Sequence, residues 1–222
     1  IMPDTVTEIC PDMFNNCTNL KTVKLSNNIN YLPNRVFVGC SSLESITIPD
    51  SVTSFGESVF FCCTSLKSVN LPDTLTTLDG TFYGCTSLES ITIPSGITSV
   101  YQPFVGCTNL KNVTIQNGMA KIPADLFYKC TGLESIVIPD SVADIGDGAF
   151  YECTSLDSLT IPATVTAIGK DAFSGIPLVY YAGSATGSPW GATQVSNAGL
   201  LSSSLGGGYK SWDQLVADGN VI

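Results

Sequence analysis

The sequence predicts a β-rich solenoid of about eight stacked coils, each 22–23 residues long. Three observations predict it: phenylalanine recurs at a nearly constant spacing, cysteine follows it three residues later, and a Leu-x-x-Ile-x-Ile pattern follows the cysteine. A unit this short costs more conformational entropy to order than its own apolar side chains return. Each unit must therefore rest on its neighbours, as in a repeat protein.

The phenylalanine column sets the period of the repeat. Its consecutive members are separated by 23 residues, except for two adjacent steps of 22. The members are Phe14, Phe37, Phe60, Phe82, Phe104, Phe127, Phe150 and Phe173. The cysteine column is Cys17, Cys40, Cys63, Cys85, Cys107, Cys130 and Cys153, and Ile176 stands at the eighth position. This constancy of phase predicts that both columns lie inside the stack.

The segment "SLESITIP", residues 42–49, is the predicted strand of its coil. Leu43, Ile46 and Ile48 are predicted to point inward. Pro49 ends the strand because proline has no N–H to donate. The same pattern in every coil predicts parallel strands in register, about 4.8 Å apart, on one face. Such a pattern is typical of a leucine-rich repeat solenoid, shaped as a β-rich α/β horseshoe or arc.

The rest of each coil returns the chain to the next phenylalanine. Residues 50–55, "DSVTSF", are predicted to turn and form a second, shorter extended piece. Residues 56–60, "GESVF", are predicted to form one helical turn that carries Phe60 inward.

The two ends of the stack differ from its middle. Residues 1–182 are predicted to be the repeat array, with a degenerate last coil that caps it through Val179–Tyr181 and Trp190. Residues 183–222 are predicted to be a cap or linker, with a short helix near 211–218 that begins after Ser211. The opening "IMPDTVTEIC" has no signal-peptide pattern, and we expect a longer parent protein.

Composition excludes several classes of function. Histidine is absent, which removes Ser/His and Cys/His catalysis and histidine metal sites. The formal net charge is −10, so a nucleic-acid partner is not expected. No apolar run is long enough to insert into a membrane. Nothing indicates a cofactor.

The nine cysteines allow three interpretations: a reduced core ladder, a disulfide, or a metal site. The ladder interpretation is favoured, because Ile176 replaces cysteine at the same phase and buried cysteine packs as a small hydrophobe. Cys62 lies outside the ladder and is the expected accessible thiol.

A column of alternating charge accompanies each strand. It reads Lys21, Glu44, Lys67, Glu89, Lys111, Glu134 and Asp157. Exposed ion pairs contribute only about 0–1 kcal/mol each, so we expect the column to favour correct register rather than high stability.

Two further columns form the outer face of the predicted sheet, and they are polar and nearly uncharged. This face is either a soluble sheet surface or a binding face, because solenoids present such sheets to partners. The candidate partner-binding residues are Ser45, Thr47, Ser68, Asn70, Ser90, Thr92, Asn112, Thr114, Ser135, Val137, Ser158 and Thr160.

The motif "GDGAFYECTSLDSLTIPATVTAIG" closely resembles the BspA-like leucine-rich repeats over residues 1–182. The resemblance ends after Phe173, where the sequence continues "SGIPLVYYAGSATGSPWGA". The resemblance implies a bacterial surface or secreted protein with a role in adhesion, and it brings no catalytic residues.

Two functions remain open from the sequence. The first is a cell-surface or secreted interaction protein, expected to be monomeric, that binds a protein or a glycan. The second is a passive spacer that presents other domains at the cell surface. An enzyme is not expected, because no nucleophile–base set or paired acids occur outside the repeating turns.

Overall fold

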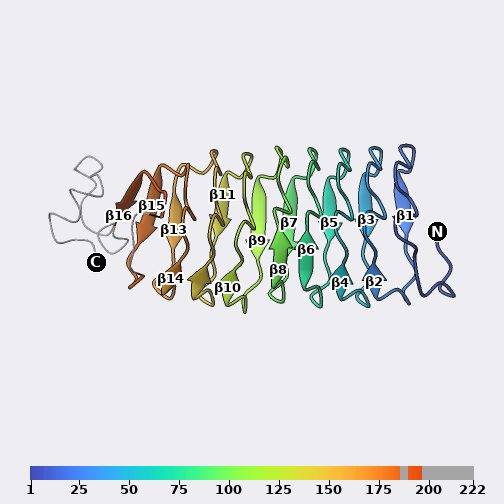
Figure 1. Cartoon of the computed structure of the whole chain (residues 1–222), viewed down its shortest axis with the longest axis horizontal. Helices are drawn as coiled ribbons and strands as arrows, with labels where there is room; N and C mark the ends of the chain where they lie inside the picture. Colours follow the sequence, from blue (N-terminus) through green and yellow to red (C-terminus); the bar gives the residue numbers. More distant parts are fainter. Residues whose placement is uncertain (186–189, 197–222) are drawn as a thin grey trace.

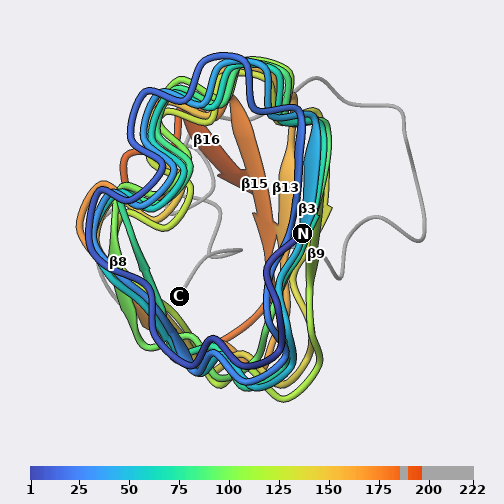
Figure 2. The same cartoon turned by 90° about the vertical axis from the view of Figure 1, so that its right-hand side faces the viewer.

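The computed structural model describes residues 1–185 and 190–196, which form one continuous stack of coils (Figure 1). Figure 2 looks along the stack and shows the outlines of the coils superimposed. Each complete coil contributes one strand to a main sheet and one short return strand on the other side of the core. The predicted leucine-rich repeat solenoid is confirmed.

The main sheet is a row of strands that form three successive hydrogen-bonded groups of three. They are β1 (Thr22–Lys24), β3 (Ser45–Thr47), β5 (Ser68–Asn70), β7 (Ser90–Ile93), β9 (Asn112–Ile115), β11 (Ser135–Val137), β13 (Leu159–Ile161), β15 (Leu178–Tyr181) and β16 (Gln194–Ser196). The return strands are β2 (Tyr31–Leu32), β4 (Ser54–Phe55), β6 (Thr77–Asp79), β8 (Ser99–Tyr101), β10 (Lys121–Ile122), β12 (Asp144–Ile145) and β14 (Ala167–Ile168).

All strand pairs are parallel and in the register that the sequence predicts. Val23 lies opposite Ile46, which lies opposite Val69, so equivalent residues of successive coils form columns. Ile46 and Val69 are buried while their strand neighbours are exposed, as the alternation requires.

The phenylalanine column is the axis of the core. The seven rings from Phe37 to Phe173 are fully buried. Consecutive rings along the column have centroids 5.1–6.2 Å apart, and six of the seven pairs are stacked. Each ring therefore touches the rings before and after it, which couples neighbouring coils.

The predicted helical turn before each phenylalanine is wrong, and no helix occurs in residues 1–185 and 190–196. The residues two before and two after the phenylalanine have positive φ, for example Arg35 (56°) and Gly39 (67°) around Phe37. Left-handed residues at these positions are incompatible with a right-handed helix. The turn instead directs its amides at the next coil: Phe37 N–H donates to Val59 O at 3.0 Å.

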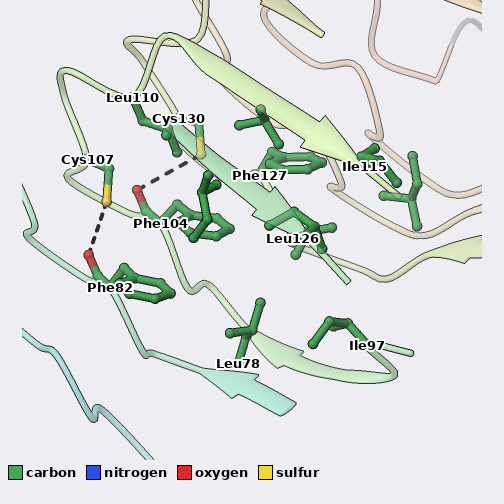
Figure 3. Packing of buried hydrophobic residues seen from close by; sticks show 14 of the residues in the cluster. Leu78, Phe82, Ile97, Phe104, Cys107, Leu110, Ile115, Leu126, Phe127 and Cys130 are labelled. Atoms are coloured by element: carbon green, nitrogen blue, oxygen red, sulfur yellow. Dashed lines mark hydrogen bonds between the residues drawn. The ribbon is translucent and has the colours of Figure 1, made fainter. Parts of the chain in front are cut away.

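The cysteine column is a buried ladder of hydrogen-bond donors. Each thiol from Cys40 to Cys153 points at the carbonyl of the phenylalanine 25 or 26 residues earlier. Figure 3 shows two of these contacts, Cys107 to Phe82 at 3.1 Å and Cys130 to Phe104 at 4.0 Å. Cysteine thus fills a small apolar space and also gives a buried carbonyl a weak donor.

The accessible thiols are more numerous than predicted. Cys62 is half-buried, and Cys10 and Cys17 are both exposed. Cys17 belongs to the first coil of the stack, where no preceding coil of the described chain covers it.

The buried thiols predict a loss of stability in alkali. Burial raises the pKa of Cys40 from 9.0 to about 11, and those of Cys107 and Cys153 to about 12. Below about pH 9 the thiols are neutral in the folded and unfolded chains, so stability is constant. Above it, only the unfolded chain ionises. We expect the free energy of unfolding to fall from about pH 9 upward, by about 1.4 kcal/mol per pH unit for each protected thiol.

Urea unfolding between pH 8 and pH 11 measures this slope. The matched variant is Cys107→Val, because an aliphatic residue already occupies this column at Ile176. Its slope should be shallower by about 1.4 kcal/mol per pH unit. Equal slopes for the two proteins would show that the Cys107 thiol is not protected.

The alternating charge column forms a single ion pair among its members, all of which the structure describes. Lys111 Nζ lies 2.7 Å from Glu134 Oε1, and both side chains are more than half exposed. The column is therefore not a continuous series of ion pairs, because solvation and side-chain entropy offset weak exposed pairs. Its expected role in register stays a prediction.

The last described coil closes on an aromatic cluster. Trp190 is 5% exposed and packs edge-on against Phe173 and Tyr181. β16 pairs in parallel with β15. The assignment of residues 183–222 as a cap or linker stays a prediction, and the expected helix near 211–218 lies outside the described residues.

Candidate binding face on the main sheet

The twelve candidate residues lie where the sequence places them, on the outer face of the main sheet. All twelve are exposed. They form two straight columns, because Ser90 pairs with Asn112 and Asn112 with Ser135, while Thr92 pairs with Thr114 and Thr114 with Val137. Their spacing along the stack repeats the strand spacing, so this face presents regular rows of hydroxyl groups.

Val137 interrupts these polar columns. Its side chain is 80% exposed, more than that of any other large hydrophobic residue of the described chain except Ile1. Valine suits a strand because its side chain is β-branched. The fold does not require an apolar group here, because the β-branched but polar Thr114 occupies the equivalent position of the neighbouring strand. An exposed valine on an otherwise polar sheet face is a candidate contact point.

The main sheet is open beside Val137. β11 belongs to one three-stranded sheet and β13 to the next, and no strand pairing joins them. A groove of about 450 Å³ lies between them, lined by Ile136, Val137, Ser158 and Thr160, among others. The opening leaves Ile136 half-buried, whereas Ile91 and Val113 of the same column are buried. The groove therefore has an apolar floor.

Acidic side chains surround the groove. Glu134, Asp140 and Asp157 line it, and no basic side chain does. Glu134 is partly neutralised by its bond to Lys111, a bond that also raises the pKa of Lys111. The groove thus combines an apolar floor with a negative rim, an arrangement that attracts a basic and apolar ligand.

Tyr180 is a face residue that the sequence interpretation missed. It lies opposite Thr160 in the same outer column, half-buried, between β13 and β16. The last coil is shortened, so Tyr180 falls out of phase with the repeat and was interpreted only as part of the cap. Aligning "LVYYA" with "SLTIP" by alternation could have found it. We call Ile136, Val137, Thr160, Tyr180 and the groove the β11–β13 patch.

Other types of site are not indicated in the described residues. They contain no group of three or more His, Cys, Asp or Glu side chains placed to hold a metal ion. None of the chain in residues 1–185 and 190–196 forms a helix long and apolar enough to cross a bilayer.

Similar crystal structures come from bacterial leucine-rich repeat proteins. A leucine-rich cell surface protein from Faecalibacterium prausnitzii is 33% identical, with a TM-score of 0.58, over 69% of this chain and 43% of that one. A leucine-rich repeat protein from Bacteroides ovatus is 28% identical, with a TM-score of 0.61, over 81% of this chain and 60% of that one. This chain thus spans about half of each relative.

The Treponema pallidum leucine-rich repeat protein shares the fold at 23% identity and a TM-score of 0.52, over 77% of this chain and 70% of that one. No curated protein matches the sequence significantly. The family model described as the BspA type leucine-rich repeat region matches six times, over residues 1–103 and 79–185. The chain therefore belongs to the BspA-type leucine-rich repeat family.

Proposed function

We propose that this chain is a non-enzymatic interaction scaffold that binds a protein partner at the β11–β13 patch. The observation that carries the proposal is the 80% exposure of Val137 beside an open groove, on a face that is otherwise uniformly polar. Binding energy in protein interfaces concentrates in a few apolar or aromatic residues surrounded by polar ones. Val137 and Tyr180 fit that role, with the threonine and serine columns around them.

The chemistry of the patch favours a protein segment that carries both basic and apolar side chains. Glu134, Asp140 and Asp157 attract a lysine or arginine, and Ile136 and Val137 accept an aliphatic or aromatic side chain. The net charge of −10 adds a long-range attraction for a basic partner. A glycan is favoured less, because the half-buried Tyr180 is the single aromatic side chain in these outer columns of the described strands.

A bacterial surface is the proposed location. The family consists of repeat scaffolds, and the Faecalibacterium prausnitzii relative is described as a cell surface protein. We extend that location, and a role in adhesion, to this chain. A passive spacer remains the alternative, and it has no need of an apolar patch.

Selection of random twelve-residue peptides displayed on phage tests the proposal. We expect enriched peptides to combine lysine or arginine with aliphatic or aromatic residues. The variants Val137→Asp and Tyr180→Ala should each weaken binding of these peptides by about tenfold or more, measured by fluorescence anisotropy.

Thr47→Asp is the matched control, because Thr47 is an exposed residue at the same position of a distant coil. It adds the same charge away from the patch and should leave binding unchanged. Enriched peptides that bind the Val137→Asp variant as tightly as the parent would contradict the proposed site. Failure to enrich any peptide would favour the spacer, and binding confined to a glycan array would replace the protein partner with a carbohydrate.

A further inference from the structure

In the described chain, one pair of neighbouring coils lacks the turn hydrogen bonds that join six other pairs. In each turn, the amides of the phenylalanine and of the residues two before and two after it donate to the following coil. These three bonds are present at six interfaces, which are those that follow Phe14, Phe37, Phe60, Phe82, Phe127 and Phe150. After Phe104, none of the amides of Gln102, Phe104 and Gly106 donates to the following coil. Among the seven interfaces that follow Phe14 to Phe150, this is the one that lacks all three turn bonds.

The return strands are also separated at this interface. β6 pairs with β8, and β10 pairs with β12 and β14, but β8 and β10 do not pair. Figure 1 shows a wider spacing between β8 and β10 than between other neighbouring return strands. In this described part of the chain, no backbone hydrogen bond joins residues 97–107 to residues 119–130. We call the space between these two ranges the seam.

The main sheet holds the same two coils together. β9 and β11 pair through three residues, so the coils are joined on one side and open on the other. Inside the seam, the Phe104 and Phe127 rings are 6.2 Å apart, and the Cys130 thiol is 4.0 Å from the Phe104 carbonyl, against 3.1 Å for the other thiols of the ladder. The Gln102 side chain bridges to the Asp125 carboxylate.

A change in coil length causes the break. The steps from Phe60 to Phe82 and from Phe82 to Phe104 are 22 residues long, whereas the steps before and after them are 23 residues long. Return strands of different length therefore lie side by side at two interfaces, β4 beside β6 and β8 beside β10. Between β4 and β6, Thr77 Oγ1 accepts from Phe55 N–H and donates to Phe55 O, both at 2.9 Å. Between β8 and β10, no side chain of the described residues replaces the missing backbone bonds in this way.

The seam contains a cavity of about 490 Å³. Its walls are largely apolar and include Ile97, Val100, Ala120, Pro123 and Ala124. Val100 is half-buried, whereas Leu78 and Ile122 at the equivalent position of neighbouring coils are fully buried. This volume lies within the range of sites that hold a small ligand or a large side chain.

We propose that the seam accepts an extended segment of a partner polypeptide, inserted between β8 and β10 with an aliphatic side chain in the cavity. Two unpaired strand edges face each other here, and an extended backbone is the ligand that offers donors and acceptors to both. Insertion requires β8 and β10 to stand about 9.6 Å apart, twice the strand spacing. The β9–β11 pairing allows this opening, because it holds the coils together on the other side of the core.

Amide hydrogen exchange of the free protein tests the first half of the proposal. Gln102, Phe104 and Gly106 should exchange about a hundredfold faster than Gly80, Phe82 and Gly84, the equivalent amides of the preceding turn. Equal protection in the two turns would overturn the seam itself.

Peptide binding tests the second half. The probe is a fluorescein-labelled seven-residue peptide without basic side chains, Ser-Thr-Val-Thr-Val-Thr-Ser, so that the acidic β11–β13 patch does not attract it. Its control has proline in place of the central threonine. Proline removes one backbone donor, so the affinity of the control should be lower by about tenfold or more. At saturation, the probe should slow exchange at Gln102, Phe104 and Gly106 by about tenfold or more.

Val100→Phe is designed to fill the cavity, because the equivalent position of an earlier coil holds the buried Phe55, and it should abolish probe binding. Thr47→Asp, at a main-sheet position outside both the seam and the β11–β13 patch, should leave probe binding unchanged. If the probe binds without slowing exchange at the three amides, insertion is excluded. Insertion is also excluded if the proline control binds the protein as tightly as the probe does. The exchange measurement on the parent protein decides the outcome even if the Val100→Phe variant does not fold.

Discussion

Phe82→Ala is expected to lower the free energy of unfolding by about 3–5 kcal/mol. Phe82 is fully buried at the centre of the stack, and its ring lies 5.5 Å from Phe60 and 5.6 Å from Phe104. Its removal leaves a cavity between three coils and breaks the column of stacked rings. A folded domain is stabilised by only about 5–15 kcal/mol in total, so this one change takes a large part of the stability.

Thermal and urea unfolding, followed by circular dichroism, measure the effect. Tyr83→Ala is the matched control, because Tyr83 is the next residue and its ring also stacks, 4.9 Å from Phe61, but 39% of it is exposed. We expect the control to cost about 1 kcal/mol. If the two variants lose similar stability, the phenylalanine column is not the axis of the core.

Gly146→Ala is expected to cost about 2–4 kcal/mol, although it adds a single methyl group. Gly146 is buried where its coil contacts the preceding one, and its N–H donates to Ile122 O at 2.9 Å. A Cβ at this position would lie 2.8 Å from Ala124 Cα and 2.9 Å from the Pro123 carbonyl carbon. Both are backbone atoms that no side-chain rotation can move, so the coils must separate.

Gly96→Ala provides the comparison. There the nearest atom to an added Cβ is Leu75 O at 3.3 Å, a contact that a small shift relieves. We expect a change within about 1 kcal/mol, since alanine also restricts the unfolded chain. Urea midpoints measured under identical conditions give both values. A Gly146→Ala protein as stable as the Gly96→Ala protein would mean that the coils are less tightly apposed at Gly146 than the structure shows.

The core was predictable because every coil gives the same evidence. Phe60, Cys63 and Leu66 lie at constant phase in a repeat of known length, and period-two alternation assigned Ile46 to the inside. The turn was not predictable in the same way. A short segment such as "GESVF" satisfies a helical turn locally, and the left-handed residues around Phe60 form only because the next coil accepts their amides.

The candidate sites depend on departures from the repeat. The sequence shows where these departures occur, but it does not show how they change the structure. The two 22-residue steps are visible in the sequence, but Thr77 bridges the first mismatch and nothing comparable bridges the second. Val137 stands out among its column, yet the groove beside it depends on how β13 is placed. Tyr180 was missed because the last coil shortens the repeat.

The turns have one more consequence, which concerns how such an array can grow. At the six interfaces with complete turn bonds, the turn amides donate to the following coil and the carbonyls that accept them face the preceding one, as in the bond from Phe127 N–H to Ala149 O. A coil inserted back to front would set donor against donor. Tandem duplication within a gene always copies a unit in the same orientation, so each new copy arrives with matching ends. Lengthening by whole units therefore requires no new interface, whereas the loss of a single residue, as at Phe82 and Phe104, leaves a mismatch in the structure.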